Sequence, residues 1–564
     1  MSQQSYSSGT SAVPLLGKTI GDQFDEIVQR FSEREALIVH HQNIRWTYGD
    51  LREEVNRCAK ALLACGLQKG DRLGIWSPNR SEWAVLQFAT AKVGVILVNI
   101  NPSYRTHELK YALHQSGCKM LVLADQFKKS NYVQMISDLV PELLAGGGER
   151  AMAKELPELQ RLVVLSQHPP NALWSWGDLL AKASAIVDQE LVDRQKSLAF
   201  DDPINIQYTS GTTGYPKGAT LSHHNILNNG YFVARTMNFT ENDRLIIPVP
   251  LYHCFGMVMG NLGCMTHGAT MIYPSEGFDP LAVLQAVERE KATAIYGVPT
   301  MFIAQLAHPD FEQYDLQSLR TGIMAGSPCP IEVMKKVQTV MNMSEVQIAY
   351  GMTETSPVST QTRMGTPLEK QVSTVGQVHP HIEIKIIDPG TGLVVPLGEP
   401  GELCTRGYSV MLGYWNDRER TEEAIDAARW MHTGDIATMD EEGFVNVVGR
   451  IKDMIIRGGE NIYPREIEEF LYTHPKVGEV QVIGVPSSKY GEEVMVRVQE
   501  GTELTREELL TFCHGQIAHF KIPKYIKFTD DFPMTVTGKI RKVEMRKISI
   551  QELNLLSEDG IKTA

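Results

Sequence analysis

The sequence predicts an α/β protein in which a large N-terminal domain with mostly parallel sheets and a β section precedes a small α+β domain. Strand-like and helix-like segments alternate from Arg45 onward, which is typical of parallel sheets covered by helices. The pattern changes after Lys452, where a helix, two strands and a further helix follow. A chain of 564 residues, 43% of them hydrophobic, is long enough for more than one domain.

Capping residues and apolar runs delimit the first elements. Thr47 to Asp50 offers an N-terminal cap for a helix that runs to Ala64, and Gly66 ends it. The same reading predicts strands at 72–76, 95–98, 120–123 and 293–297, and helices at 81–92, 106–115 and 280–290. These cycles form the large domain.

The second half of the chain contains two further regions. Short alternating runs between residues 376 and 413 predict an antiparallel β section that closes the large domain. Beyond it, Pro464 begins a helix, and Thr505 with Glu508 forms a capping-box pattern. Strands are expected at 480–483 and 494–498. We place a disordered tail at residues 1–22, the large domain at 23–448 and the small domain at 449–564.

Composition and charge exclude several classes of protein. The net charge of −13 argues against nucleic acid as the main partner, because phosphate binding favours a basic surface. No window approaches eighteen continuous apolar residues, so we expect no transmembrane helix. The Ser/Gln-rich start has no apolar run, and no arginine precedes Arg30, so we expect neither a secretory signal nor a transit peptide and predict a cytoplasmic protein.

The eight cysteines form no C-x-x-C pair, which favours reduced, buried thiols. One group has residue types that suit zinc, but its spacing matches no standard zinc site: His253, Cys254, Cys264 and His267. A packed loop and helix is the preferred interpretation.

The segment 208–218 is the most informative part of the chain. It combines three glycines, four Ser or Thr residues and Lys217 within Tyr-Thr-Ser-Gly-Thr-Thr-Gly-Tyr-Pro-Lys-Gly. Such a loop can surround a polyphosphate with backbone N–H groups, hydroxyls and one positive charge. The P-loop pattern fails at Pro216 and Gly218. A flexible linker would need neither the lysine nor the proline.

This segment resembles the signature of the adenylate-forming (AMP-binding) superfamily. Four other motifs of that superfamily follow in its order: residues 350–355, 433–435, 449–462 and 537–539. Further segments look like its medium-chain acyl-CoA synthetase branch: 219–223, 250–254, 454–464 and 519–525. The resemblance covers nearly the whole chain and implies a small C-terminal domain that rotates about a hinge.

The resemblance implies an acid–thiol ligase. The carboxylate of a medium-chain fatty acid would attack ATP to give an acyl-adenylate and pyrophosphate, and CoA would then give acyl-CoA and AMP. Mg²⁺ would accompany ATP, and a homodimer is compatible with the resemblance. Three other readings remain open: an aryl-acid CoA ligase, a stand-alone adenylation domain that loads a carrier protein, and a luciferase-like oxygenase or a non-catalytic nucleotide-binding protein.

The family roles transfer to these residues by resemblance. The catalytic group would be Lys539, Thr353, Glu354 and His253, with Glu354 also the metal ligand. ATP would be bound by Thr209, Ser210, Gly211, Thr212, Thr213, Gly214, Lys217, Gly326, Ser327, Pro328, Tyr350, Gly351, Met352, Thr353, Asp435, Arg450 and Lys539. CoA would be bound by Gly458, Gly459, Phe520, Lys521 and Lys524, and Lys452 would be the hinge. The acyl pocket would include Tyr252, His253, Phe255, Ile323 and Ala325.

The predicted acyl pocket is apolar. No charged partner for an ammonium group is evident around residues 251–256 or beside Ile323. Burying an unpaired charge is costly, so this composition favours a fatty or aryl acid over an amino acid.

Overall fold

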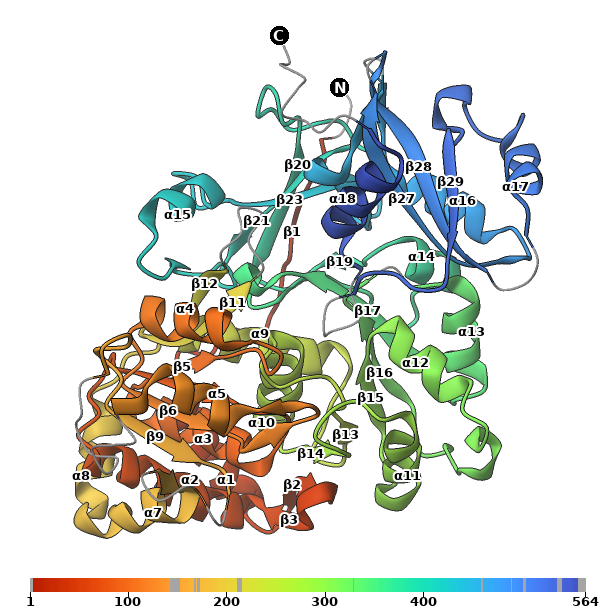
Figure 1. The fold of residues 1–564 in the computed structure, drawn as a ribbon. Coiled ribbons are helices and arrows are strands. Elements are labelled where there is room, and N and C mark those ends of the chain that lie inside the picture. The colour runs from red at the N-terminus through yellow and green to blue at the C-terminus, as the bar shows by residue number, and fades with distance from the viewer. Residues whose placement is uncertain are drawn as a thin grey trace. The chain divides into compact units, whose positions relative to one another are not determined.

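The computed structural model describes residues 4–142, 153–166, 169, 173–209, 216–327, 329–457, 460–487, 489–500, 504–534 and 540–555 (Figure 1). The chain forms two compact units. The larger unit contains residues 7–384 and 405–431, and the smaller unit contains residues 1–6, 385–404 and 432–564. The domain boundary that we predict between residues 448 and 449 stays a prediction.

Two large sheets form the framework of the larger unit. The first has the order β10-β9-β6-β4-β5-β11-β12-β22. Its strands are β4 (Arg72–Trp76), β5 (Ile96–Asn99), β6 (Met120–Leu123), β9 (Arg161–Val164), β10 (Trp174–Ser175), β11 (Pro203–Thr209), β12 (Lys217–Ser222) and β22 (Gly413–Tyr414). The strands from β10 to β11 pair in parallel, whereas β12 pairs antiparallel with both β11 and β22.

The second sheet has the order β19-β18-β17-β16-β15-β13-β14-β2-β3. Its strands are β2 (Glu35–Val39), β3 (Ile44–Thr47), β13 (Arg244–Ile246), β14 (Thr270–Tyr273), β15 (Ala294–Gly297), β16 (Thr321–Ala325), β17 (Glu345–Gly351), β18 (Val358–Gln361) and β19 (Gln377–Val378). Pairing is parallel from β17 to β2 and antiparallel at both edges. The prediction of mostly parallel sheets is confirmed.

Helices cover both sheets (Figure 1). The larger unit contains α1 (Ile20–Phe31), α2 (Tyr48–Ala64), α3 (Ser81–Val93), α4 (Thr106–Ser116), α5 (Tyr132–Leu139), α7 (Trp176–Ala181), α8 (Asp188–Lys196), α9 (His223–Thr236), α10 (Gly263–His267), α11 (Pro280–Glu290), α12 (Pro299–Leu306), α13 (Ile331–Thr339), α14 (Leu368–Ser373) and α15 (Arg418–Ala424). Short helices are η1 (His40–Gln42), η2 (Lys182–Ala185), η4 (Phe311–Gln313) and η5 (Thr353–Thr355), and η3 (Phe255–Leu262) is a π-helix. A two-stranded ribbon joins β7 (Gln126–Phe127) and β8 (Ser130–Asn131).

Local sequence explains these helices. Thr47 accepts a hydrogen bond from the Asp50 N–H, and the Asp50 side chain accepts one from the Thr47 N–H, so the predicted cap of α2 is confirmed. Helix α3 is buried on nearly every side, with Trp83 and Phe88 fully enclosed. A helix that is apolar all round packs inside a large core, as α3 does.

The smaller unit and its flanking strands contain two five-stranded sheets. One has the order β1-β20-β21-β23-β24, and the other has the order β26-β25-β28-β27 with β29 beside β28. The strands are β1 (Tyr6–Ser8), β20 (Ile382–Ile387), β21 (Gly401–Gly407), β23 (Met431–Met439), β24 (Val445–Arg450), β25 (Ile455–Arg457), β26 (Glu460–Ile462), β27 (Val477–Ser487), β28 (Gly491–Glu500) and β29 (Tyr525–Thr529). The helices are α16 (Pro464–Tyr472), α17 (Arg506–Cys513), α18 (Lys542–Glu552), η6 (Ile451–Asp453) and η7 (His519–Lys521).

One expectation is wrong for the described residues. We expected a disordered tail over residues 1–22, but Tyr6–Ser8 is strand β1 and helix α1 begins at Ile20. Backbone bonds order the strand: Ser5 N–H donates to Val395 and Gly9 N–H donates to Ile382. The polar composition of this segment suggested disorder. The residues that order it lie almost 400 positions away, so no local signal indicates the strand. Among the described residues, no helix is long and apolar enough to cross a bilayer.

The buried carboxylate of Glu290 is bonded to side chains from three segments of the second sheet and its connections: β3, β13 and η1. Glu290, at the end of α11, has a side chain that is only 2% exposed. Arg45 Nη2 lies 2.8 Å from both of its oxygens, Arg244 Nη2 lies 3.0 Å from Oε2 and His40 Nε2 lies 2.9 Å from Oε1. Burial alone would raise the Glu290 pKa, but the hydrogen bonds from Arg45 and His40 bring the pKa below its ordinary value of 4.5.

We expect Glu290→Ala to destabilise the larger unit by about 2 kcal/mol, because the hydrogen bonds between the buried carboxylate and its two partly exposed arginines are lost. A carboxylate with a depressed pKa stabilises the fold above its unfolded pKa, and this contribution is lost as the pH falls through the folded pKa. The difference in melting temperature between variant and wild type should therefore be large at neutral pH and shrink below about pH 4. The exposed Glu312→Ala is the control, and an equal loss there would contradict the assignment.

Candidate active site

The predicted phosphate loop connects two antiparallel strands of the first sheet. Strand β11 ends at Thr209 and β12 begins at Lys217, and these two residues are register partners. The loop therefore leaves a strand, as predicted, and returns as the neighbouring strand. Five predicted ATP-binding residues in this loop lie outside the described residues: Ser210, Gly211, Thr212, Thr213 and Gly214.

Glu354 lies in η5, directly after β17, and is 6% exposed. Its Oε1 accepts hydrogen bonds from the Tyr414 hydroxyl at 2.9 Å and from the Thr209 hydroxyl at 3.3 Å. Within the described residues, Oε2 has no hydrogen-bond partner. A carboxylate with one uncommitted oxygen suits a hard cation such as Mg²⁺, so the residues present fit this metal.

The predicted adenine-side residues lie at the C-terminal ends of β16 and β17 in the second sheet. Strands β16 and β17 pair in parallel with Ala325 opposite Ala349, so Gly326 and Ser327 leave β16 beside Tyr350. A Cβ on Gly351 would lie 1.7 Å from the Pro357 carbonyl oxygen, so this position accepts only glycine. Met352 and Thr353 follow towards Glu354. Pro328 lies outside the described residues.

The predicted acyl residues belong to a sulfur-rich and aromatic part of the core. Tyr252 and His253 have ring centroids 4.1 Å apart, and Phe255 lies 5.3 Å from Tyr296. Tyr296 is the β-register partner of Ile323, and Ile323 and Ala325 belong to the same core cluster as Tyr252. Phe255 begins the π-helix η3, which we did not predict. Burial raises the pKa of the Cys254 thiol, so it remains protonated here.

Two members of the zinc-type group belong to helix α10 instead. Cys264 is fully buried, and its Sγ lies 3.8 Å from the Thr270 carbonyl oxygen. His267 Nδ1 lies 3.2 Å from the Gly263 carbonyl oxygen, and burial lowers its pKa to about 4. Cys264 thus contacts a main-chain carbonyl of β14, and His267 contacts one of α10 itself.

The predicted ribose residues lie in the smaller unit. Asp435 on β23 pairs with Arg450 on β24, with Arg450 Nε 3.0 Å from Oδ1. The turn before Asp435 is held from β21: Gly434 N–H donates to Glu402 Oε1 at 3.1 Å, and His432 Nδ1 lies 2.9 Å from Glu402 Oε2. Glu402 therefore orients the turn that presents Asp435.

The predicted CoA residues also lie in the smaller unit. Phe520 and Lys521 form part of η7, where Lys521 pairs with Glu466. Lys524 Nζ lies 3.4 Å from Glu493 Oε1. Lys452, the predicted hinge, is the central residue of η6. Gly458, Gly459 and Lys539 lie outside the described residues.

Motif reading missed Tyr414, Glu402 and His432. Tyr414 donates a hydrogen bond to Glu354, which is 60 residues away in sequence, and the side chains of Glu402 and His432 are hydrogen-bonded although they are 30 residues apart. Glu402, His432 and Cys404 form a group whose ligand atoms could hold a metal ion. However, the distance of 2.9 Å between His432 Nδ1 and Glu402 Oε2 is that of a hydrogen bond between imidazole and carboxylate. The Gly-Tyr-Trp run at 413–415 was the only local signal for Tyr414.

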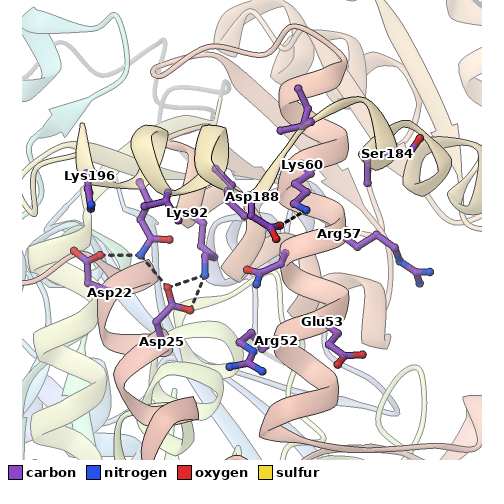
Figure 2. A pocket seen from close by; sticks show the side chains of 16 residues that line it. Asp22, Asp25, Arg52, Glu53, Arg57, Lys60, Lys92, Ser184, Asp188 and Lys196 are labelled. Carbon is purple, nitrogen blue, oxygen red and sulfur yellow. Dashed lines mark hydrogen bonds and ion pairs between the residues drawn. The ribbon is translucent and has the colours of Figure 1, made fainter.

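A cavity of about 830 Å³ lies elsewhere in the larger unit (Figure 2). Its lining includes no predicted site residue, and several of its charged side chains form ion pairs. Lys92 Nζ lies 2.6 and 2.8 Å from the two oxygens of Asp25, and Lys60 pairs with Asp188 (Figure 2). We therefore assign the active site from the motif residues and not from this cavity.

Comparisons with known proteins agree with this geometry. The family described as AMP-binding enzyme matches residues 24–415, and the family described as AMP-binding enzyme C-terminal domain matches residues 466–539. The chain is 48% identical over 545 residues to the putative acyl-CoA synthetase YngI of Bacillus subtilis, covering 96% of this chain and 99% of the relative. It is 48% identical over 559 residues to the mitochondrial medium-chain acyl-CoA ligase ACSF2 of Danio rerio, covering 98% and 91%.

Solved structures give the same family. The anthranilate CoA ligase AuaEII in complex with anthranoyl-AMP is similar with a TM-score of 0.83 and 25% identity, covering 96% of this chain and 99% of that one. ATP-bound MatB from Rhodopseudomonas palustris is similar with a TM-score of 0.79 and 28% identity, covering 94% and 99%. The chain belongs to the AMP-binding, adenylate-forming enzyme family.

Proposed function

We propose that this chain is an AMP-forming acyl-CoA ligase that acts on medium-chain fatty acids. It would convert a carboxylate and ATP into an acyl-adenylate and pyrophosphate, and then transfer the acyl group to CoA with release of AMP. The observation that carries the proposal is the cluster of Thr209, Lys217 and Glu354 beside a hairpin loop with the family's phosphate signature. Relatives of nearly full length are named medium-chain acyl-CoA ligases, which supports the fatty-acid specificity.

The proposed chemistry needs positioned charge more than a covalent nucleophile. A carboxylate oxygen attacks the α-phosphorus of ATP, and pyrophosphate leaves, so negative charge must be stabilised on both sides of the transferred group. Lys217 would bind the leaving phosphates, and Thr353 would donate to the α-phosphate. Mg²⁺, held by Glu354, would neutralise phosphate charge when bound. Lys539 would bridge the two reacting groups in this step.

The second half-reaction needs a different arrangement of the smaller unit. The thiol of CoA attacks the acyl carbonyl and AMP leaves with the bonding electrons. Asp435 and Arg450 would keep hold of the ribose during both steps, because a carboxylate accepts hydrogen bonds from both hydroxyls of a diol. Gly458, Gly459, Phe520, Lys521 and Lys524 would bind CoA after rotation about Lys452.

Residues around the acyl group support an apolar substrate. Phe255 packs with Tyr296, and Tyr252 belongs to the same core cluster, which contains several methionines. An amino acid would bring an ammonium group into this cluster, whose described members include no carboxylate, and burying an unpaired charge costs several kcal/mol. The proposal therefore places the alkyl chain here, with His253 between it and the adenylate.

Compartment and assembly are part of the same proposal. We propose a cytoplasmic enzyme, although the vertebrate relatives are named mitochondrial. Fractionation of cells that express the full chain, with the enzyme found in the mitochondrial fraction, would contradict the cytoplasmic location. A homodimer would appear as twice the chain mass of 63.0 kDa in light scattering.

A substrate screen tests the proposed function. With ATP, Mg²⁺ and CoA, AMP release should be highest with straight-chain acids of intermediate length such as octanoate. It should be lower with acetate and absent with amino acids, because the acyl region is apolar. Benzoate and anthranilate belong in the screen, since a structural neighbour is an anthranilate CoA ligase. Pyrophosphate exchange with amino acids and none with octanoate would overturn the proposal.

Two variants should separate the half-reactions. Lys539→Ala should reduce adenylate formation by about a hundredfold or more, because a positive charge at the reacting groups is removed. It should largely spare thioester formation from supplied acyl-adenylate. Lys452→Pro should do the reverse, since proline restricts Ile451 in η6 and limits rotation. Pyrophosphate exchange and CoA-dependent AMP release distinguish them, and equal loss of both steps in each variant would contradict both roles.

Asp435→Ala should weaken ATP binding by about tenfold or more, because charge-assisted hydrogen bonds to the ribose are lost. The effect should be smaller for 2′-deoxy-ATP, which offers one hydroxyl fewer. Titration calorimetry without acid or CoA measures both affinities. Asp440→Ala, on the turn after β23, is a matched carboxylate control away from the turn that Glu402 holds. An equal loss for both nucleotides would argue against a ribose contact.

A further inference from the structure

We propose that Tyr414 is a positioning residue: its hydroxyl holds Glu354 so that one carboxylate oxygen faces the metal of the metal–ATP complex, and its ring orients Lys217. The inference rests on the proposed function, in which Glu354 binds Mg²⁺ and Lys217 binds phosphate. Tyr414 lies on β22, within the larger unit that also contains Glu354 and Lys217.

Hydrogen bonds divide the Glu354 carboxylate into two unequal oxygens. Tyr414 Oη donates to Oε1 at 2.9 Å, and Thr209 Oγ1 donates to the same oxygen at 3.3 Å. Two donors on Oε1 prevent rotation that would exchange the oxygens. Oε2, without a partner in the described part of the chain, then keeps a fixed direction and can bind a cation.

The burial of Tyr414 supports its role as donor. The side chain is only 8% exposed, so water has little access to its hydroxyl as an alternative partner. A buried donor beside a carboxylate is a suitable anchor, since hydrogen bonds to charged groups are stronger than neutral ones.

The ring of the same tyrosine faces the lysine of the phosphate loop. Lys217 Nζ lies 4.8 Å from the ring centroid, which is within the range of a cation–π interaction. Backbone pairing fixes this approach: Tyr414 is the register partner of Ala219, and Trp415 N–H donates to Gly218 at 2.7 Å. One side chain thus contacts both the metal carboxylate and the phosphate lysine.

Backbone contacts also hold η5 against this strand. Met411 N–H donates to the Glu354 carbonyl at 2.9 Å, and Leu412 N–H donates to Thr220 at 2.9 Å. The segment that leads into β22 therefore bridges η5 and β12 before Tyr414 is reached. The backbones of Glu354 and Lys217 are therefore positioned by main-chain hydrogen bonds. The Tyr414 side chain can then orient the two side chains without being needed for the stability of the fold.

Tyr414→Phe tests the hydroxyl alone, because the ring and its contact with Lys217 remain. The readout is the factor by which Mg²⁺ strengthens ATP binding, from calorimetric dissociation constants with excess Mg²⁺ and with EDTA, without acid or CoA. We expect this factor to fall by about tenfold, the usual effect of losing a hydrogen bond to a charged group, while ATP affinity in EDTA stays unchanged. An unchanged factor would overturn the inference.

A double variant separates this inference from the proposed function. If Tyr414 acts through Glu354, then Tyr414→Phe combined with Glu354→Gln should lower the Mg²⁺ factor no further than Glu354→Gln alone. Additive losses would overturn a positioning role. If Glu354→Gln itself leaves the factor unchanged, the proposed metal role fails. If Glu354→Gln lowers it and Tyr414→Phe does not, only the role of Tyr414 fails.

Tyr414→Leu tests the contact with Lys217. Removing the ring should weaken ATP binding in EDTA by about threefold relative to Tyr414→Phe, because the ammonium loses its π partner. Equal affinities of the two variants in EDTA would overturn the Lys217 part of the inference.

Two further variants guard against a purely structural effect. Tyr408→Phe removes another buried phenol of the same segment, whose hydroxyl has no hydrogen-bond partner among the described residues, and should leave the Mg²⁺ factor at the wild-type value. Thr209→Val removes the second donor to Oε1 and should lower the factor less than Tyr414→Phe, as its longer distance implies. The inference would be overturned if Tyr408→Phe lowered the Mg²⁺ factor as much as Tyr414→Phe does. It would also be overturned if neither Thr209→Val nor Tyr414→Phe changed the Mg²⁺ factor.

Discussion

The position of β12 between two antiparallel neighbours is the constraint on which the rest of the candidate site depends. Its pairing with β11 brings together Thr209 and Lys217, the residues on either side of the phosphate loop, and its pairing with β22 brings Tyr414 to the same place. Thr209 and Tyr414 then donate hydrogen bonds to Glu354, which follows a strand of the other sheet, and Lys217 lies over the ring of Tyr414. A shift of one residue in either pairing would turn these side chains to the opposite face.

Elements with local signals could be predicted, whereas long-range partners could not. Capping residues and apolar spacing were sufficient for the helix after Thr47 and the helix at Pro280, because such signals lie within a few residues. Strand β1 was missed because its order depends on Val395 and Ile382. Tyr414 and Glu402 were missed for the same reason: each acts on a residue that is distant in sequence, so no spacing rule can indicate it.

Two buried carboxylates show how the surroundings decide between a structural and a functional role. Both oxygens of Glu290 are bonded to arginines, and His40 adds a further contact, so this group is fully satisfied within the protein. Glu354 is almost as buried but has hydrogen bonds to one oxygen only among the described residues. Burial of a half-satisfied carboxylate is costly unless a ligand completes it. The second pattern is therefore the one expected of a metal ligand.

The region that we propose for the acyl group follows a different principle, because it depends on close backbone packing. A Cβ on Gly256 would lie 2.5 Å from the Pro250 carbonyl oxygen, and one on Gly260 would lie 2.9 Å from Ile247. Both glycines belong to the π-helix η3, which therefore approaches its neighbours more closely than a helix with side chains there could. In our proposal, the depth available to an alkyl chain beside η3 depends on how closely this helix packs. Composition alone indicated an apolar acid but not its length, since packing distance has no local signal in the sequence.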